Sequence, residues 1–299
     1  MKFINIKGYL HDLDEPLVMG ILNTTPDSFY DKSRTQLLQD IDRRVREILE
    51  EGGKIIDVGG YSSRPGAADI STGEEKQRLT PALQHLKTHY PEVTVSVDTF
   101  RADIARWAVE EYGIAIINDI SGGTMDDNMF ETVAQLQTPY ILTHTTGTPQ
   151  TMQHRTDYRD MMEEIMLYFA GRLRTLQLLG VNDVIIDPGF GFGKTVDQNY
   201  NLMRSLSEFQ LLERPLLVGV SRKSMVYDFL DCTVENSLHG TTVLHTFALM
   251  HGANILRVHD VKPAVEAVKL ITKLAKPNFA RAGLQPVRKN GTDYKSAPA

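Results

Sequence analysis

Cysteine is nearly absent from the sequence, because Cys232 is the only one in 299 residues. A single cysteine excludes a disulfide within the chain and suits a reducing compartment. Long apolar runs are absent too, since none approaches the roughly 18 residues that a membrane-spanning helix needs. The N-terminal stretch MKFINIKGYLHDLDEP carries acidic side chains where a secretory signal would carry its apolar centre. These absences lead us to expect a cytoplasmic protein without a membrane partner.

An excess of positive charge is also lacking. The 38 Asp and Glu residues outnumber the 32 Lys and Arg residues, and the net charge is −6. This balance argues against non-specific binding of nucleic acid, which requires a basic surface. Any anion that the protein binds must therefore meet a local cluster of cations. Hydrophobic residues make up 41% of the chain, which is enough to bury a sizeable core.

Apolar runs typical of buried strands alternate with helical patterns along the chain. The run PLVMGIL, at 16–22, is apolar throughout, as expected for a strand that is buried on both faces. After it, Ile41, Val45 and Ile48 fall at helical spacing, and the longest helical pattern covers 158–179. We predict eight strands, at 16–22, 54–60, 93–98, 115–119, 140–144, 183–187, 215–220 and 254–258.

Strict alternation of strands and helices predicts an α/β fold with a parallel sheet and right-handed crossovers. Eight such units fit a closed (β/α)8 TIM barrel, with an open doubly wound sheet as the alternative. The stretch FINIKGYL, at 3–10, alternates like a strand, and we expect it to form a β-hairpin at the barrel floor. We predict one barrel domain over residues 1–275 and a disordered tail over 276–299, which is polar and aperiodic.

The stretch DPGFGFGKT, at 187–195, resembles a phosphate-binding loop at first sight. The pattern GxxxxGK[ST] would require a glycine where this chain has Pro188, and proline has no N–H to offer a phosphate. We therefore interpret the stretch as the end of a buried strand, a glycine-rich turn and the start of a helix. On this interpretation Lys194 is not a phosphate lysine, and Asp187 lies at a strand end.

Polar residues follow nearly every predicted strand, at the end of the barrel where functional groups gather. They are Asn23, Asp57, Asp98, Asn118, Asp119, His144, Asp187, Ser221 to Lys223 and Arg257 to Asp260. Capping of the next helix, or fixing of a loop, explains any one of them about as well as function does, and for Asp57 and Asp119 it is the simpler interpretation. Capping does not explain why acids and bases should converge on one mouth.

One part of this set is rich in hydrogen-bond acceptors. It consists of Asp98, Asn118 and Asp187, with Lys223 as a nearby cation. The two oxygens of one carboxylate match a flat heterocycle that presents a ring N–H beside an exocyclic NH₂. An asparagine can both donate to such an edge and accept from it.

The other part is rich in donors. Arg64, Arg257 and His259 have the geometry and charge to bind a phosphate or a pyrophosphate. Asn23 ends the first barrel strand, and its amide oxygen is a candidate ligand for a hydrated Mg²⁺ bound to that anion.

Several motifs, in this order, resemble those of the dihydropteroate synthase family: MGILNTTPDSF, IDVGGYSSRPGA, SVDT, NDISGG, IDPGFGFGK, GVSRKSM and RVHD. The resemblance extends over residues 1 to 275, and SRKSM with RVHD is its most specific part. It implies a barrel that forms a homodimer and serves folate biosynthesis as a transferase and sulfonamide target. The implied reaction joins p-aminobenzoate to 6-hydroxymethyl-7,8-dihydropterin pyrophosphate, with Mg²⁺, and gives dihydropteroate and pyrophosphate.

The resemblance also implies a role for each matching residue. The pterin would be held by Asp98, Asn118, Asp187 and Lys223. The pyrophosphate would be held by the metal on Asn23 and by Arg64, Arg257 and His259. The aminobenzoate pocket would use Phe29, Ser63, Pro65, Phe192, Lys223 and Ser224. The residues implied to act in catalysis are Arg64, Lys223, Arg257 and His259.

Two loops depart from the common wording of the family. GGYSSRPGA replaces GGESTRPGA, so that Ser63 keeps a hydroxyl while Tyr61 replaces a Glu without an evident reason. ILTHTTGTP replaces LMHMQGTP, so that Thr145 takes the place of a Met expected over the pterin, and His144 is interpreted as structural.

Two other functions stay open. They are a methyltransferase that uses methyltetrahydrofolate and a corrinoid partner, which has no pyrophosphate to bind, and a non-catalytic pterin-binding protein, which would be expected to lack the cationic cluster or Phe29.

Overall fold

The computed structural model describes residues 2–25, 34–62 and 69–275 of the chain. Four predicted site residues, Phe29, Ser63, Arg64 and Pro65, lie outside the described residues. The segment 276–299, for which a disordered tail is predicted, lies outside them as well.

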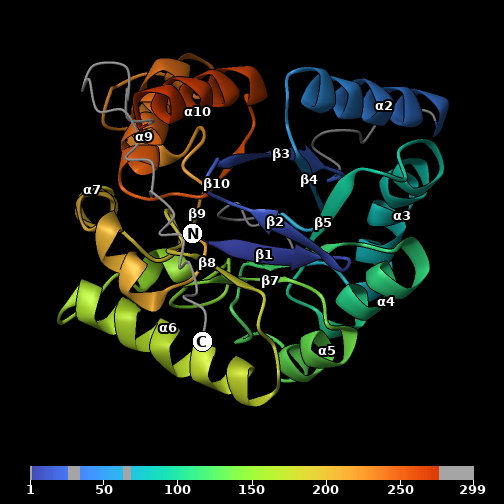
Figure 1. Cartoon of the computed structure of the whole chain (residues 1–299), viewed down its shortest axis with the longest axis horizontal. Coiled ribbons are helices and arrows are strands. Elements are labelled where there is room, and N and C mark those ends of the chain that lie inside the picture. The colour runs from blue at the N-terminus through green and yellow to red at the C-terminus, as the bar shows by residue number, and fades with distance from the viewer. Residues whose placement is uncertain (1, 26–33, 63–68, 276–299) are drawn as a thin grey trace, which may run out of the picture.

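Eight parallel strands form the centre of the molecule, and helices surround them (Figure 1). The strands are β3 (Leu17–Asn23), β4 (Ile55–Gly59), β5 (Thr94–Asp98), β6 (Ile116–Asp119), β7 (Tyr140–Thr143), β8 (Val184–Asp187), β9 (Leu217–Val218) and β10 (Ile255–Val258). Their order is β8-β7-β6-β5-β4-β3-β10-β9, and an isolated parallel bridge between Ile186 and Leu216 joins the two ends. Each predicted strand overlaps one of these strands, so the predicted barrel is confirmed.

Helices follow the strands in the alternating order that the sequence predicts. The α-helices are α2 (Arg34–Glu50), α3 (Thr72–His89), α4 (Ala102–Tyr112), α5 (Met129–Leu136), α6 (Met161–Leu178), α7 (Val196–Arg204), α8 (Ser224–Tyr227), α9 (Leu238–Met250) and α10 (Val261–Ala275). Short 3₁₀ turns are η1 (Met152–His154), η2 (Leu206–Leu212) and η3 (Glu235–Ser237). Within the described residues, no helix combines the length and apolar character required to cross a bilayer.

Local sequence signals set where two of these helices begin. Helix α6 starts after Asp160, whose side chain accepts a hydrogen bond from the backbone N–H of Glu163. Helix α7 starts after Thr195, which forms a reciprocal capping box with Gln198. Such caps satisfy N–H groups that have no partner within the helix. The second cap fixes the point at which the chain leaves the glycine-rich turn after β8.

The hydrophobic core has two parts, on either side of the barrel wall. The larger part fills the space between strands and helices, and it includes the fully buried Ile41, Val45 and Ile48 of α2. The smaller part fills the barrel floor, where Ile4 and Ile6 pack with side chains from the barrel interior. Burial of this apolar surface is the main force that holds the strands and helices together.

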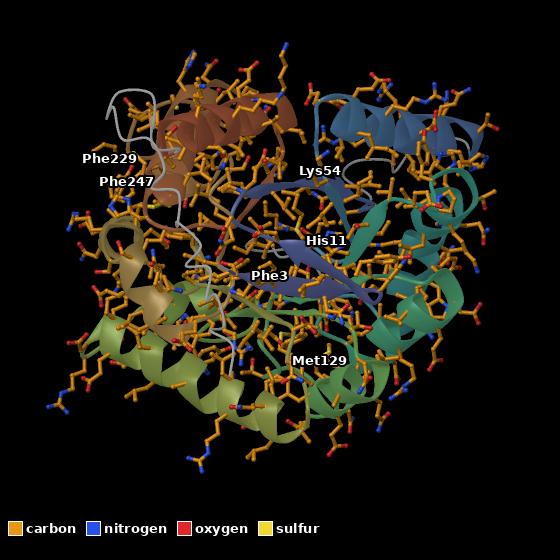
Figure 2. The ribbon with its side chains drawn as sticks, viewed as in Figure 1. Phe3, His11, Lys54, Met129, Phe229 and Phe247 are labelled. Carbon is orange, nitrogen blue, oxygen red and sulfur yellow. The ribbon has the colours of Figure 1, made fainter. Side chains whose placement is uncertain are left out.

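An N-terminal hairpin closes the barrel floor, as predicted. Its strands are β1 (Phe3–Ile6) and β2 (Tyr9–Asp12), which pair antiparallel. Figure 1 shows the hairpin across the end of the barrel that faces the viewer, and Figure 2 labels Phe3 and His11 on it. Ile4, Ile6 and Leu13 are buried, whereas Phe3 is 42% exposed. Because the hairpin occupies the floor, a ligand must enter the barrel interior from the opposite end.

The strand register brings polar side chains together above this apolar floor. Asp57 lies next to Ser96, and, two residues further along, Gly59 lies next to Asp98. Asp98 in turn lies next to Asn118. Alternate residues of a strand face the same side, so Ile55 in the floor and Asp57 above it both face the interior. The interior therefore changes from apolar at the floor to polar at the mouth.

Candidate functional site

A partly buried arginine joins two carboxylates at the barrel mouth. Arg257 Nε donates to Asp57 Oδ2 at 2.6 Å, and Arg257 Nη2 donates to Asp98 Oδ2 at 2.6 Å. Asn118 Nδ2 donates to the same Asp57 oxygen at 3.0 Å. Burial lowers the pKa of Arg257, but the neighbouring carboxylates of Asp57 and Asp98 raise it by more, so the pKa lies above its ordinary value. The network thus ties together the ends of β4, β5, β6 and β10.

Asp57 is central to this network, so the interpretation of Asp57 as a helix cap or loop anchor is wrong. Its side chain is fully buried, and its Oδ1 atom has no hydrogen-bond partner within the described residues. The strand alternation could have revealed this position, because Asp57 follows the buried Ile55 by two residues. Asp119 does fix a loop, as expected, since its carboxylate accepts from the backbone N–H groups of Ser121 and Gly123 at 2.7 Å each.

Burial strongly affects the carboxyl group of Asp98. Its side chain is 17% exposed, and burial raises its pKa to about 7, against the opposing effect of the Arg257 cation. Asn118 beside it is 3% exposed. The two side chains therefore offer an acid and an amide at the same edge of the mouth, which suits a ligand edge that both donates and accepts.

Asp187 and Lys223 lie at the other side of the mouth. Asp187 Oδ1 accepts from the backbone N–H of Gly189 at 2.8 Å. Burial raises the pKa of Asp187, and the Lys223 cation opposes that effect most strongly. Lys223 Nζ donates to the carbonyl of Phe190 and lies 4.5 Å from the ring centroid of Phe192.

These two sides form one site. Burial lowers the pKa of Lys223 to about 8, and Asp187, Arg257 and Asp98 all act on it as well. Since charges act on one another in this way only at short range, Asp98, Asp187 and Lys223 lie near one another. Asn118 joins them because it lies beside Asp98 and donates to Asp57. Ser224, predicted for the aminobenzoate pocket, follows Lys223 directly as the first residue of α8.

His259 is held at the mouth by the loop after β9. Its backbone N–H donates to Ser221 Oγ at 3.1 Å, and its Nδ1 lies 3.2 Å from the same oxygen. Burial and then the Arg257 cation lower the pKa of His259 to about 4, so the ring is neutral at pH 7. Arg257, predicted to bind an anion together with His259, lies among the carboxylates of the acceptor-rich part. The donor-rich and acceptor-rich parts are therefore in contact and share Arg257.

Asn23 ends β3 beside Gly59, and its surroundings fit a magnesium ligand. A Cβ atom at Gly59 would lie 3.5 Å from Asn23 Oδ1 and 3.7 Å from Asp98 Oδ2, so both oxygens face the space above this glycine. Mg²⁺ prefers oxygen ligands and usually keeps several waters while it binds one or two side chains and a substrate phosphate. Among the described residues, no group of three or more His, Cys, Asp or Glu side chains could hold a metal ion.

The residues that differ from the common family motifs make hydrogen bonds and ring contacts within the protein. Tyr61 accepts a hydrogen bond from Gln150 Nε2 at 2.8 Å, and its ring packs edge-on against Phe100, with centroids 5.0 Å apart. Tyr61 thus links the loop after β4 to the loop after β7. Thr145 Oγ1 donates to the carbonyl of Gly147 at 3.2 Å. His144 is buried with its Nδ1 3.0 Å from Lys194 Nζ, which fits a structural role.

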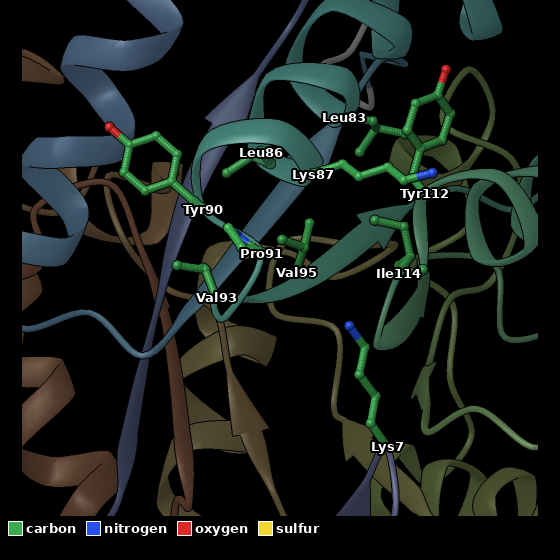
Figure 3. A pocket seen from close by; sticks show the side chains of 11 residues that line it. Lys7, Leu83, Leu86, Lys87, Tyr90, Pro91, Val93, Val95, Tyr112 and Ile114 are labelled. Atoms are coloured by element: carbon green, nitrogen blue, oxygen red, sulfur yellow. The ribbon is translucent and has the colours of Figure 1, made fainter.

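A separate hollow lies at the opposite end of the barrel. It measures about 100 Å³ and is lined by apolar side chains such as Leu83, Leu86 and Val95, with Lys7 at its edge (Figure 3). Lys7 belongs to the turn of the floor hairpin, and Val95 lies in the first half of β5. The hollow is therefore separate from the polar mouth.

The fold and the mouth together define a class of protein, a barrel enzyme that binds a pterin-like heterocycle. In agreement with this, residues 19–259 match the family described as pterin binding enzyme. The chain belongs to the dihydropteroate synthase family. It is 41% identical to dihydropteroate synthase from Escherichia coli K12 over 276 residues, which cover 91% of this chain and 97% of that protein. It is also 41% identical to the enzyme from Synechocystis over 260 residues, or 86% of this chain and 89% of that protein.

Solved structures of the family have the same fold. The Yersinia pestis enzyme in complex with a sulfonamide drug superimposes with a TM-score of 0.82 and is 37% identical, covering 91% of this chain and 98% of that one. The Thermus thermophilus enzyme in complex with 4-aminobenzoate gives a TM-score of 0.80 at 33% identity, covering 92% of this chain and 100% of that one.

Proposed function

We propose that the protein condenses 6-hydroxymethyl-7,8-dihydropterin pyrophosphate with p-aminobenzoate and releases 7,8-dihydropteroate and pyrophosphate. The observation that carries this proposal is the set of buried and half-buried carboxylates, amide and cations at one barrel mouth. Such groups are costly to bury unless they are paired or serve a ligand. Membership of the dihydropteroate synthase family supports the same reaction.

The pterin binds in the acceptor-rich part of the mouth. Asp187 accepts from the ring N–H and the exocyclic NH₂ of the heterocycle, and Asn118 and Asp98 contact the rest of its polar edge. Lys223 remains a cation below its pKa of about 8 and donates to a ring nitrogen or carbonyl of the pterin. The apolar floor beneath these residues limits how deep the ligand can go.

The pyrophosphate binds at the outer edge of the mouth. Arg64, Arg257 and His259 donate to its oxygens, and the neutral His259 does so through a single ring N–H. Two guanidinium nitrogens of Arg257 hold Asp57 and Asp98, and the third nitrogen, Nη1, takes no part in those bonds. Mg²⁺, held by Asn23 when bound, would neutralise charge on the departing pyrophosphate.

The p-aminobenzoate binds beside the pterin. Phe29, Pro65 and Phe192 contact the faces of its ring, while Ser63 and the start of α8 at Ser224 receive its polar groups. The Thermus thermophilus relative was solved with 4-aminobenzoate and the Yersinia pestis relative with a sulfonamide. We therefore expect sulfonamides to compete with p-aminobenzoate in this protein.

Bond breaking precedes bond formation in the proposed reaction. The bond from the pterin methylene carbon to oxygen breaks, and pyrophosphate leaves with the electron pair, which the electron-rich pterin makes possible. The amine nitrogen of p-aminobenzoate then attacks the cationic methylene carbon and loses a proton. The protein contributes position and charge: Arg64, Arg257 and His259 stabilise the leaving group, and Lys223 orients the pterin.

The setting of the reaction is part of the proposal. The single cysteine, Cys232, suits the cytoplasm. A homodimer is supported by large apolar side chains that are exposed toward the C-terminal end of the barrel domain: Phe229, Leu230, Val234, Val243, Met250, Leu270 and Leu274. Helix α9 packs against both α8 and α10, so these side chains lie on neighbouring elements, and monomeric proteins seldom leave large apolar patches in water.

Pyrophosphate release tests the proposal. The purified protein is given the pterin pyrophosphate and Mg²⁺, with and without p-aminobenzoate, and pyrophosphate and dihydropteroate are both measured. We expect dihydropteroate only with p-aminobenzoate, in a one-to-one ratio with pyrophosphate, and inhibition by a sulfonamide. Pterin binding without product would favour a non-catalytic pterin-binding protein. Methyl transfer from methyltetrahydrofolate to a corrinoid, without pyrophosphate release, would favour the methyltransferase.

A further inference from the structure

Lys194, in the stretch DPGFGFGKT, is buried next to the mouth and uses all of its hydrogen-bond donors. The residue is 4% exposed. Its Nζ lies 3.0 Å from the carbonyl oxygen of Gly189, 3.1 Å from that of Phe192, and 3.0 Å from His144 Nδ1. A protonated lysine has three N–H donors and no acceptor, so these three contacts occupy it completely.

This environment leaves Lys194 no direct role toward a substrate. Burial lowers its pKa to about 7, a value that would suit an acid or a base. However, a proton acceptor needs a free lone pair within reach of the substrate, and the three partners surround the nitrogen instead. A phosphate is excluded for the same reason. The effect of Lys194 on a ligand must pass through the groups that it holds.

Those groups belong to both substrate pockets. Gly189 is held from two sides, because its N–H donates to Asp187 Oδ1 at 2.8 Å while its carbonyl accepts from Lys194. Gly189 has a φ of +71°, and a Cβ atom there would lie 2.0 Å from the His144 carbonyl oxygen. At the other end of the loop, Lys194 holds the Phe192 carbonyl, and the Phe192 ring lies 4.5 Å from Lys223 Nζ.

We propose that Lys194 is a positioning residue for the pterin site, which fixes the backbone at Gly189 and thereby the direction of the Asp187 carboxylate. The inference rests on the proposed function, because it takes Asp187 to bind the pterin. Lys194 also acts on Asp187 by charge, since Lys223 and Lys194 both oppose the effect of burial on the pKa of that carboxyl. Without Lys194, the Gly189 carbonyl loses one of its two donors, the other being the backbone N–H of Phe192 at 3.1 Å. The backbone angles at Gly189 are then held less firmly, so its N–H can move away from Asp187.

A double-mutant cycle tests the inference. The affinity for a bare pterin, 6-hydroxymethylpterin, is measured by calorimetry for the wild type, Lys194→Met, Asp187→Asn and the double variant. Each single change is expected to weaken binding at least about tenfold, because each removes a charge-assisted hydrogen bond. If Lys194 acts through Asp187, the double variant binds within about threefold of the weaker single variant. Independent effects would multiply to about a hundredfold, and that result would overturn the inference.

The controls separate positioning from loss of stability. Leu86→Ala truncates a buried side chain of the outer core that lines the hollow at the opposite end of the barrel, so it should lower the melting temperature and leave pterin affinity unchanged. If Lys194→Met does not fold, Lys194→Gln, which keeps one donor, is measured in the same way. Failure of the wild type to bind the pterin would contradict the proposed function too. Normal binding by the wild type and by Lys194→Met, with loss in Asp187→Asn, would contradict only the role of Lys194.

Discussion

A single carboxylate, that of Asp57, accepts hydrogen bonds from two strands that are far apart in the sequence. Its Oδ2 atom accepts from Asn118 Nδ2 and from Arg257 Nε, and the Asp57–Arg257 pair is separated by 200 residues. Removing one partner of a buried ion pair leaves the other charge without compensation. Asp57 therefore fixes two side chains that are proposed to contact the substrate, although it lies beneath them.

We predict that Asp57→Asn weakens pterin binding at least about tenfold and lowers the free energy of unfolding by about 1–3 kcal/mol. The amide that replaces the carboxylate keeps the shape but cannot neutralise Arg257. Calorimetry with a bare pterin and urea unfolding give the two quantities. Asp119→Asn is the matched control, because Asp119 is equally buried but accepts from Tyr140 and from loop N–H groups outside the interior. Asp119→Asn should lose stability but bind the pterin with wild-type affinity. If Asp57→Asn also bound the pterin with wild-type affinity, the prediction would be contradicted.

His245 makes stability depend on pH. It is buried in α9, burial lowers its pKa to about 4, and its Nε2 atom has no partner within the described residues. The unfolded chain protonates this ring near pH 6.5, whereas the folded protein does so only near pH 4. Its contribution to stability is therefore complete above pH 6.5 and is lost as the pH falls toward 4.

We predict that the stability of His245→Leu, relative to that of the wild type, increases as the pH falls. Between pH 7 and pH 4, the difference in free energy of unfolding should shift toward the variant by about 3 kcal/mol, because one pKa unit corresponds to about 1.36 kcal/mol. Urea unfolding of both proteins at several pH values measures this difference. Taking the difference removes the effects of other titrating groups, such as Asp98. A constant difference across the range would show that His245 is not buried in the neutral form.

The strands show what the sequence can and cannot predict about the elements. Continuous apolar runs such as VIID before Pro188 identify buried parallel strands because both faces are covered, and that information is local. β9 is shorter than its apolar run at 215–220, since pairing with β10 covers only Leu217 and Val218 and contact with β8 is a single bridge. The point at which the barrel closes depends on how β8 and β9 pair with each other, so the sequence of either strand alone does not predict it.

Helix α2 contacts the two strands that carry the proposed anion ligands. Arg44 Nε donates to the carbonyl of Ile21 at 3.2 Å, and Arg44 Nη2 donates to the carbonyl of His259 at 2.6 Å. The first contact is two residues before Asn23 on β3, and the second lies directly after β10. The helix therefore fixes the distance between Asn23 and His259 through one side chain.

We predict that Arg44→Gln lowers kcat/KM for the pterin pyrophosphate about tenfold, with near-normal affinity for a bare pterin. The reason is that loss of the charged donor frees the His259 carbonyl, whereas Asp187 and Asn118 are untouched. Steady-state kinetics and pterin calorimetry measure the two effects. Arg43→Gln is the control, because Arg43 is 75% exposed and pairs only with Asp40 of the same helix among the contacts described. An equal loss of bare pterin affinity in Arg44→Gln would contradict the prediction.

At the scale of the whole molecule, the site depends on the register of strands that are distant in sequence. Asp98, Asn118, Asp187 and Lys223 could be predicted because each ends a recognisable strand or lies in a specific motif. The pairing of Arg257 with Asp57 and Asp98 could not, since it requires knowledge of which strands face each other across the interior. The donor-rich and acceptor-rich parts therefore seemed separate in the sequence, although they meet at one arginine in the fold.

The exposed apolar side chains can be interpreted as a contact surface only when their positions in the whole molecule are known. Val243 and Met250 lie two turns apart on one face of α9, with exposed fractions of 67% and 68%. Phe229, 66% exposed, lies on the same side of the molecule as Phe247 of α9 in the view of Figure 2. This surface, defined by Phe229, Val243 and Met250, is the proposed contact between two copies of the chain.

We predict that the wild type sediments as a dimer and that Val243→Asp with Met250→Glu makes it a monomer. A stable interface needs about 1,200–2,000 Å² of buried surface with an apolar centre, and two buried carboxylates at that centre would cost more than the contact contributes. Leu167→Glu is the control, because Leu167 is 64% exposed on α6 and outside this surface, so its change should leave the dimer intact. Sedimentation equilibrium of the three proteins decides the outcome. A monomeric wild type, or a double variant that remains dimeric, would show that copies of the chain do not associate through α9.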